Sequence, residues 1–219
     1  MNLLQIALTT KCNLKCPTCP MAEYRTDEHP KYVITNVRLI AYLYKYIDPK
    51  EWFIELTGGE PGTYEDLPAL LDWLQTHQYR GLIKTNGILP IPKFGHFPRI
   101  AAFHNLKMPP KYYDQILIVY GNDMNAKADW CNERNIPFQV IGFNKDAIDN
   151  TKHDIKRMSF IDAIGQVLAC PACKPSPNIT QYGDQSMIDF SEPRDHLACT
   201  HCKAIIDFWR FIEPAWRLL

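Results

Sequence analysis

The chain has 219 residues, 46% of them hydrophobic and 22% charged, a composition typical of a globular protein with one sizeable core. Its 24 basic and 24 acidic residues cancel, which argues against a generally basic nucleic-acid-binding surface. No segment approaches the roughly 18 consecutive apolar residues of a membrane span, so we expect no membrane contact and a cytoplasmic protein.

Apolar segments between turn residues predict the elements of the first half. In chain order we expect a strand over 3–10, a helix over 36–47, a strand over 51–59, a helix over 66–78 and a strand over 81–87. The N-terminal segment lacks a basic leader, so we interpret it as a strand rather than a signal peptide.

The two helices of the first half carry start signals in the sequence. Asn36 and Asp66 stand where N-caps are expected, because short polar side chains accept hydrogen bonds from the first helical turn. The buried face of the first helix is expected to consist of Val37, Ile40, Ala41, Tyr44 and Ile47.

The pattern continues less regularly up to residue 143. Three prolines and a glycine predict an irregular crossing over 88–98, followed by strands over 99–106, 115–121 and 137–143 and a helix over 123–135. Strands that alternate with helices indicate an α/β fold with a parallel sheet. Six strands are too few for a closed eight-stranded barrel, which leaves an open six-stranded barrel or a doubly wound sheet. In both, functional residues belong at the carboxyl ends of the strands.

The last third of the chain has a different character. Two short strands are expected around a turn at 163–165, and the chain closes with a helix that ends before Pro214. Between them stand two C-x2-C pairs, Cys170 with Cys173 and Cys199 with Cys202. A unit too small for its own core usually needs a metal, so we expect one domain over 1–148 and a cysteine-rich subdomain over 149–219.

Three further cysteines, Cys12, Cys16 and Cys19, follow the first expected strand with the spacing C-x3-C-x2-C. Without an export signal, such clusters favour metal binding over disulfides. A four-iron cluster normally takes four thiolates, so three would leave one iron open to an exchangeable ligand. The remaining Cys131 stands alone on an expected helix and is interpreted as a buried thiol.

The sequence "CNLKCPTC" (12–19) resembles the signature of the radical S-adenosylmethionine (radical SAM) enzymes, as do "LTGGEP" (56–61) and "KTNG" (84–87) at the next two strand ends. The resemblance covers residues 3–143. It implies a partial (β/α)6 TIM-type barrel and a [4Fe–4S] cluster on the three cysteines, whose open iron binds S-adenosylmethionine (SAM).

The resemblance also implies which residues contact SAM. Gly58 and Gly59 would let the backbone approach SAM, and Glu60 would accept hydrogen bonds from its ammonium group. Thr85 and Asn86 are candidates at the third strand end.

Later strand ends supply weaker candidates. His104 and Asn105 stand at the fourth strand end, where the family often places a ribose contact, and Ile141 and Gly142 on the sixth strand could flank adenine. Thr18 departs from the family, which usually has an aromatic residue there, so no binding role is carried over to it.

The second cysteine group, together with Gly165, is similar to the SPASM and twitch subdomains of many radical SAM enzymes. The four cysteines are therefore expected to hold a second [4Fe–4S] cluster, with a structural zinc site as the alternative.

The resemblance implies an enzyme that cleaves SAM reductively to a 5′-deoxyadenosyl radical, which abstracts hydrogen from a substrate. The appended subdomain suggests a peptide or a modified nucleotide or nucleic acid as substrate, and a flavodoxin or ferredoxin is expected as electron donor. Alternatives are an activase of glycyl-radical enzymes, a deazaguanine-synthase-like enzyme, and a metal-stapled binding module without catalysis.

Overall fold

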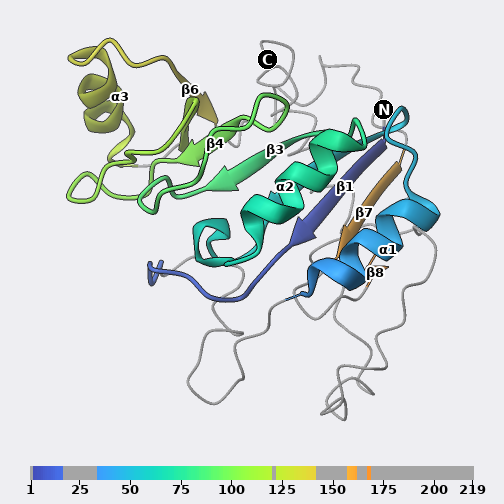
Figure 1. Ribbon diagram of the computed structural model, residues 1–219. Helices are drawn as coiled ribbons and strands as arrows, with labels where there is room; N and C mark the ends of the chain where they lie inside the picture. The colour runs from blue at the N-terminus through green and yellow to red at the C-terminus, as the bar shows by residue number, and fades with distance from the viewer. Residues whose placement is uncertain (1, 17–33, 120–121, 142–156, 162–166, 169–219) are drawn as a thin grey trace.

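The computed structural model describes residues 2–16, 34–119, 122–141, 157–161 and 167–168. Its centre is an eight-stranded sheet with the order β6-β5-β4-β3-β2-β1-β7-β8 (Figure 1). The strands are β1 (Asn2–Ala7), β2 (Trp52–Thr57), β3 (Arg80–Thr85), β4 (Arg99–Ala102), β5 (Gln115–Val119), β6 (Phe138–Ile141), β7 (Arg157–Ile161) and β8 (Val167–Leu168). The helices are α1 (Asn36–Tyr46), α2 (Leu67–Thr76), α3 (Met124–Asn132) and the 3₁₀ helix η2 (Pro61–Thr63).

Strands β1 to β6 pair in sequence order, and every one of these pairings is parallel. This arrangement confirms the predicted α/β fold, with a parallel six-stranded sheet of the partial-barrel type. The six expected strands all form, although β1 and β4 end three or four residues before the expected boundaries. The expected crossing at 88–98 contains neither a helix nor a strand.

Two short strands extend the sheet beyond β1. Strand β7 pairs in parallel with β1, and β8 pairs antiparallel with β7. The two strands expected around residues 163–165 therefore form and belong to the main sheet.

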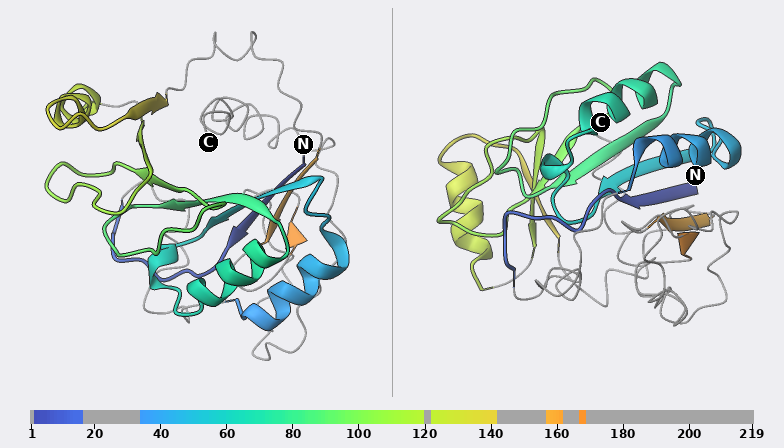
Figure 2. Two further views of the ribbon diagram at one scale, coloured as in Figure 1. Left: turned by 45° about the horizontal axis from the view of Figure 1, so that its top comes forward. Right: turned by 60° about the horizontal axis from the view of Figure 1, so that its bottom comes forward.

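Helices α1 and α2 lie side by side on one face of the sheet, and the strands fan out beneath them (Figures 1 and 2). The large core lies between these helices and the outward-facing residues of β1, β2 and β3, because alternate residues of a strand point to the same face. Its members include Leu4, Ile6, Ile54, Leu56 and Ile83 of the strands and Leu39, Leu43, Leu70 and Leu74 of the helices.

The buried face of α1 agrees with the expected one only in part. Ile47 is buried and Ile40 packs against the core, but Val37 and Tyr44 are 80% and 79% exposed, whereas Leu39, Tyr42 and Leu43 are buried. The helix is apolar on two sides, so its periodicity alone did not fix which side meets the sheet. Its N-cap is Thr35 and not Asn36, whose side chain instead donates from Nδ2 to the carbonyl of Asp66, 3.0 Å away. The second helix does begin after Asp66, as predicted.

Helix α3 covers β5 with a smaller core that contains Ile116, Ile118 and Phe103. Cys131 lies in this core with no exposed surface, which confirms the interpretation as a buried thiol.

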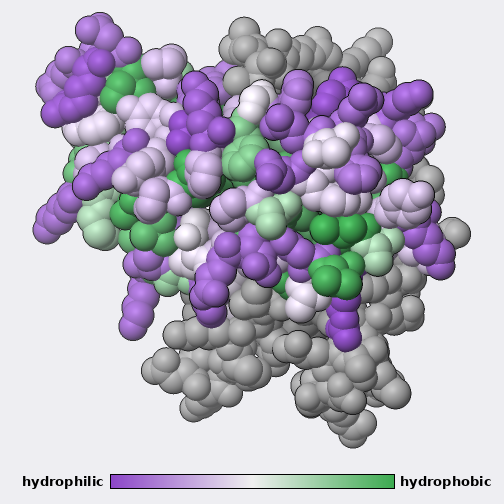
Figure 3. Space-filling model, in the orientation of Figure 1, coloured by the Kyte–Doolittle hydropathy of each residue, from purple (hydrophilic) through white to green (hydrophobic). Residues whose placement is uncertain are grey.

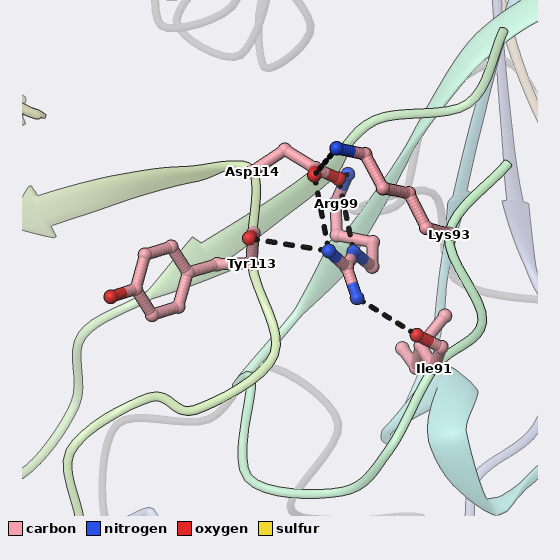
Figure 4. A network of polar contacts seen from close by, with 5 residues as sticks. All are labelled: Ile91, Lys93, Arg99, Tyr113 and Asp114. Atoms are coloured by element: carbon pink, nitrogen blue, oxygen red, sulfur yellow. Dashed lines mark hydrogen bonds and ion pairs between the residues drawn. The ribbon is translucent and has the colours of Figure 1, made fainter. Parts of the chain in front are cut away.

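An ion-pair network closes the amino-terminal edge of the sheet (Figure 4). Arg99, the first residue of β4, bonds through Nε to Oδ2 of Asp114 at 3.0 Å and through a terminal nitrogen to Oδ1 at 3.1 Å. The same guanidinium donates to the carbonyls of Ile91 and Tyr113, and the Lys93 ammonium lies 3.7 Å from Oδ1 of Asp114. This network lies at the edge opposite to the carboxyl ends of the strands, so we assign it to stability.

The surface that carries α1 and α2 is mostly hydrophilic, with small apolar groups scattered over it (Figure 3). Among the described residues, no helix has the length and hydrophobicity to cross a membrane.

Candidate functional site

The candidate site lies where β1, β2 and β3 end next to one another in the sheet. After β1 the chain runs through Cys12 and Cys16, whose side chains are both partly exposed. The amide of Leu14 lies 3.4 Å from the Cys12 sulfur, to which it donates. Cys19, the third expected ligand, lies outside the described residues.

The loop after β2 packs directly on the loop after β1. The amide of Gly59 donates to the carbonyl of Thr9 at 2.6 Å, and the amide of Glu60 donates to the carbonyl of Lys11 at 2.8 Å. A Cβ added at Gly59 would lie 2.0 Å from the backbone oxygen of Lys11. Gly58 has a backbone φ of +127°, a conformation that residues with a side chain rarely adopt. The close approach that these glycines permit is therefore to the backbone of the cysteine loop.

Glu60 joins the loop after β2 to the end of β3. Its side chain is 1% exposed. Oε1 accepts hydrogen bonds from the Thr85 hydroxyl at 2.6 Å and the Gly62 amide at 3.0 Å, and Oε2 accepts one from the Asn86 amide at 2.7 Å. In this structure both carboxylate oxygens are thus engaged by donors of the chain itself.

Asn86 in turn connects β3 with the cysteine loop. Its side-chain nitrogen donates to Oδ1 of Asn13 at 2.7 Å and lies 4.0 Å from the Cys12 sulfur. Its side-chain oxygen accepts from the amide of Ile88 at 3.0 Å. A chain of hydrogen bonds therefore runs from Glu60 through Asn86 to Asn13, and three strand ends are held together.

The electrostatics of Glu60 follow from this enclosure. Burial raises the pKa of the carboxyl group, while the hydrogen bonds from Asn86, Thr85 and Gly62 act in the opposite direction because they favour the charged form. The structure keeps a buried carboxylate here only with several donors around it.

The other predicted site residues are less closely connected with this network. His104 and Asn105 are exposed in the loop after β4, where Oδ1 of Asn105 accepts from the amide of Lys107 at 2.9 Å. The backbone of Ile141 ends β6. Thr18, Gly142 and the four C-terminal cysteines lie outside the described residues.

The side chains at these strand ends fit the cofactors that the resemblance implies. Cys12 and Cys16 are partly exposed thiols in a loop braced by backbone and side-chain bonds, and thiolates are the usual ligands of iron–sulfur clusters. Within the described part of the chain, no three metal-ligating side chains come together. The fit thus rests on these two thiols and on the loop after β2 that lies against them.

No family model matches the chain. A GTP 3′,8-cyclase from Tolumonas auensis is 33% identical over 72 residues, which cover 32% of this chain and 21% of that protein. A 7-carboxy-7-deazaguanine synthase from Aquifex aeolicus is 33% identical over 86 residues, which cover 39% of this chain and 37% of that protein. Thus the chain matches between about a fifth and two fifths of these curated relatives.

Among solved structures, SuiB of Streptococcus suis bound to S-adenosylmethionine superposes with a TM-score of 0.51 at 12% identity, over 77% of this chain and 60% of SuiB. That likeness concerns the fold. The named relatives and SuiB are radical SAM enzymes. In its cysteine, GGE and strand-end motifs and in the matched region, the chain is similar to radical SAM enzymes, a family that uses SAM and a [4Fe–4S] cluster.

The structure adds contacts that the sequence did not predict. Asn13, inside the cysteine motif, was not predicted to pair with Asn86, although both carry the amide groups that such a pair requires. The sequence did not predict the hydrogen-bond partners of Glu60 either, because the fold and not the spacing along the chain brings them together.

Proposed function

We propose that the chain is a radical SAM enzyme in which Cys12, Cys16 and Cys19 hold the cluster. The observation that carries the proposal is the convergence of the cysteine loop, the glycine-rich loop and the end of β3, joined by hydrogen bonds from Glu60 and Asn86. When bound, the cluster and SAM supply reductive cleavage of the sulfonium bond and a 5′-deoxyadenosyl radical that abstracts hydrogen from the substrate.

The residues of the chain bind and orient in this scheme. The backbone around Gly58 and Gly59 forms the wall of the SAM site against the cysteine loop. Glu60 accepts a hydrogen bond from the SAM ammonium group or holds this wall in place, and Thr85 and Asn86 complete the third strand end. His104 and Asn105 remain proposed contacts to the ribose.

The proposed substrate is a nucleotide or nucleobase of the guanine type. Support comes from the relatives, because one is named for GTP and the other for a deazaguanine product. Among the alternatives, a deazaguanine-synthase-like activity agrees with the second of these names. A peptide or a nucleic acid is the alternative substrate.

The C-terminal cysteines Cys170, Cys173, Cys199 and Cys202 are proposed to hold a second [4Fe–4S] cluster, with structural zinc as the alternative. They would belong to a SPASM- or twitch-like subdomain over 149–219 that closes the substrate side of a barrel over 1–148, although β7 and β8 at the start of this range pair with the main sheet. Electrons for the cleavage would come from a flavodoxin or a ferredoxin.

Anaerobic reconstitution with iron and sulfide, followed by reduction with dithionite, tests the proposed function. The reduced protein should convert SAM to 5′-deoxyadenosine and methionine, measured by liquid chromatography with mass detection. Replacing Cys12, Cys16 and Cys19 together by alanine should abolish this conversion. Cys131→Ala is the matched control, since this thiol lies buried in the core beneath α3 and should be dispensable. Equal conversion by the triple variant would refute the proposal.

A further inference from the structure

A row of polar side chains interrupts the apolar strands on the face of the sheet opposite to α1 and α2. Gln5 of β1 and Glu55 of β2 stand directly across from one another in the parallel pairing. Their chain neighbours Leu4, Ile6, Ile54 and Leu56 point into the helix-covered core, so Gln5 and Glu55 point to the other face. On β3, Lys84 follows Ile83, another member of that core, and also points to the opposite face.

Glu55 contacts both of the other side chains, although Lys84 lies two residues beyond Leu82, the residue of β3 that pairs with Glu55. The amide nitrogen of Gln5 donates to Oε1 of Glu55 at 2.8 Å. The Lys84 ammonium lies 3.8 Å from the same Oε1. These contacts use the Gln5 amide nitrogen and one Glu55 oxygen, so the Gln5 oxygen (Oε1) and the second Glu55 oxygen (Oε2) remain to be accounted for.

Those two oxygens are buried and have no hydrogen-bond partner within the described part of the chain. Glu55 itself is 0% exposed, and burial raises its pKa, opposed by the charge of Lys84 and the hydrogen bond from Gln5. A buried acceptor without a donor costs free energy. Such a group is most simply explained by a ligand that supplies the missing donors.

The order of the three groups across β1, β2 and β3 is acceptor, acceptor, donor. We propose that Gln5, Glu55 and Lys84 bind the edge of a planar heterocycle that presents two neighbouring N–H donors and then a carbonyl oxygen. The 2-amino-4-oxopyrimidine edge of guanine and its deaza analogues has this order. This inference rests on the proposed function, because it assigns the substrate class of the same barrel.

The charge of the row favours a neutral heterocycle over a cation. Lys84 already lies beside the Glu55 carboxylate, so a guanidinium group would bring a second positive charge next to the ammonium. A carbonyl oxygen next to Lys84 would instead receive a hydrogen bond from it. A guanine-type heterocycle and a guanidinium group both present a pair of N–H donors, so the binding experiment includes one probe of each kind.

Anaerobic calorimetry on the reconstituted protein, with SAM present, tests the assignment by measuring the binding of four probes. Guanosine 5′-monophosphate carries the full edge, inosine 5′-monophosphate lacks the 2-amino group, adenosine 5′-monophosphate has the wrong order, and agmatine carries a guanidinium. We expect the guanosine nucleotide to bind roughly tenfold or more tightly than the inosine nucleotide, since loss of one donor leaves a buried acceptor unpaired. Equal binding of the three nucleotides, or binding of agmatine alone, would overturn the proposal.

A double variant, Gln5→Leu with Glu55→Leu, distinguishes a binding role from a structural one. The guanosine preference should vanish while the melting temperature of the ligand-free protein stays the same or rises, because both partners become apolar together. A preference that survives, or a melting temperature lower by more than about 5 °C, would contradict a ligand site. If the protein cleaves SAM but binds the guanosine and inosine nucleotides equally, only this inference is refuted. If it prefers the guanosine nucleotide but does not cleave SAM, only the proposed function is refuted.

Discussion

Replacement of Glu60 by alanine tests whether this carboxylate clamps two strand ends together. The change removes the acceptor of three hydrogen bonds and leaves the Thr85 hydroxyl and the Asn86 and Gly62 amides without it. Hydrogen bonds to a charged group contribute about 1.5–3 kcal/mol each, and relaxation around an alanine recovers part of that sum. We therefore expect the free energy of unfolding to fall by about 3–5 kcal/mol, at the upper end of single-residue effects.

Urea denaturation of the cluster-free protein, followed by circular dichroism, measures this loss. Glu65→Ala is the matched control, because Glu65 is an exposed carboxylate in the same loop and its removal should change stability by less than about 0.5 kcal/mol. SAM binding to the reconstituted Glu60→Ala protein should weaken by roughly 1.5–3 kcal/mol with unchanged iron content. If SAM binding weakens while the free energy of unfolding is unchanged, Glu60 does not hold the two strand ends together. Its role is then a direct contact to the SAM ammonium group.

Two other measurements concern the rest of the chain. Burial would raise the pKa of Asp114, but the hydrogen bonds and charge of Arg99, with the charge of Lys93, hold it below its usual value. The ionised carboxylate therefore stabilises the folded state above the unfolded pKa, and this contribution is lost as the pH falls through the folded pKa. Asp114→Asn should cost about 1–2 kcal/mol at pH 7 and progressively less below about pH 4, and a pH-independent difference in urea titrations would contradict the ion pair. For the C-terminal cysteines, metal analysis of the reconstituted protein should give about eight irons without zinc, or about four irons and one zinc for the alternative, whereas four irons alone would exclude both.

The sequence was sufficient to predict the parallel sheet, because each βα unit carries its own apolar pattern and turn signals. It did not predict the buried side of α1. Val37 and Tyr44 on one side and Leu39 and Leu43 on the other can each face a core, so the packing against β1 and β2 decides between them. The position of β7 next to β1 was also hidden, since pairing between distant segments leaves no mark in local periodicity.

For the candidate site, the motifs predicted which strand ends carry polar residues but not how those residues pair. The contact between Asn13 and Asn86 joins positions 73 residues apart. The sequence did, however, contain a signal for the polar side chains on the face of the sheet opposite to α1 and α2. Gln5 and Glu55 are each flanked by apolar residues within a strand, and a polar residue at a buried strand position often marks a functional or strained site.

The backbone contact between Gly59 and the cysteine loop has a thermodynamic consequence. Because the Lys11 carbonyl occupies the place of a missing Cβ, neither loop can shift appreciably without displacing the other. A ligand that orders one loop therefore lowers the entropic cost of ordering its neighbour. Linkage requires this help to be mutual: whatever factor the cluster adds to the affinity for SAM, SAM must add to the retention of the cluster.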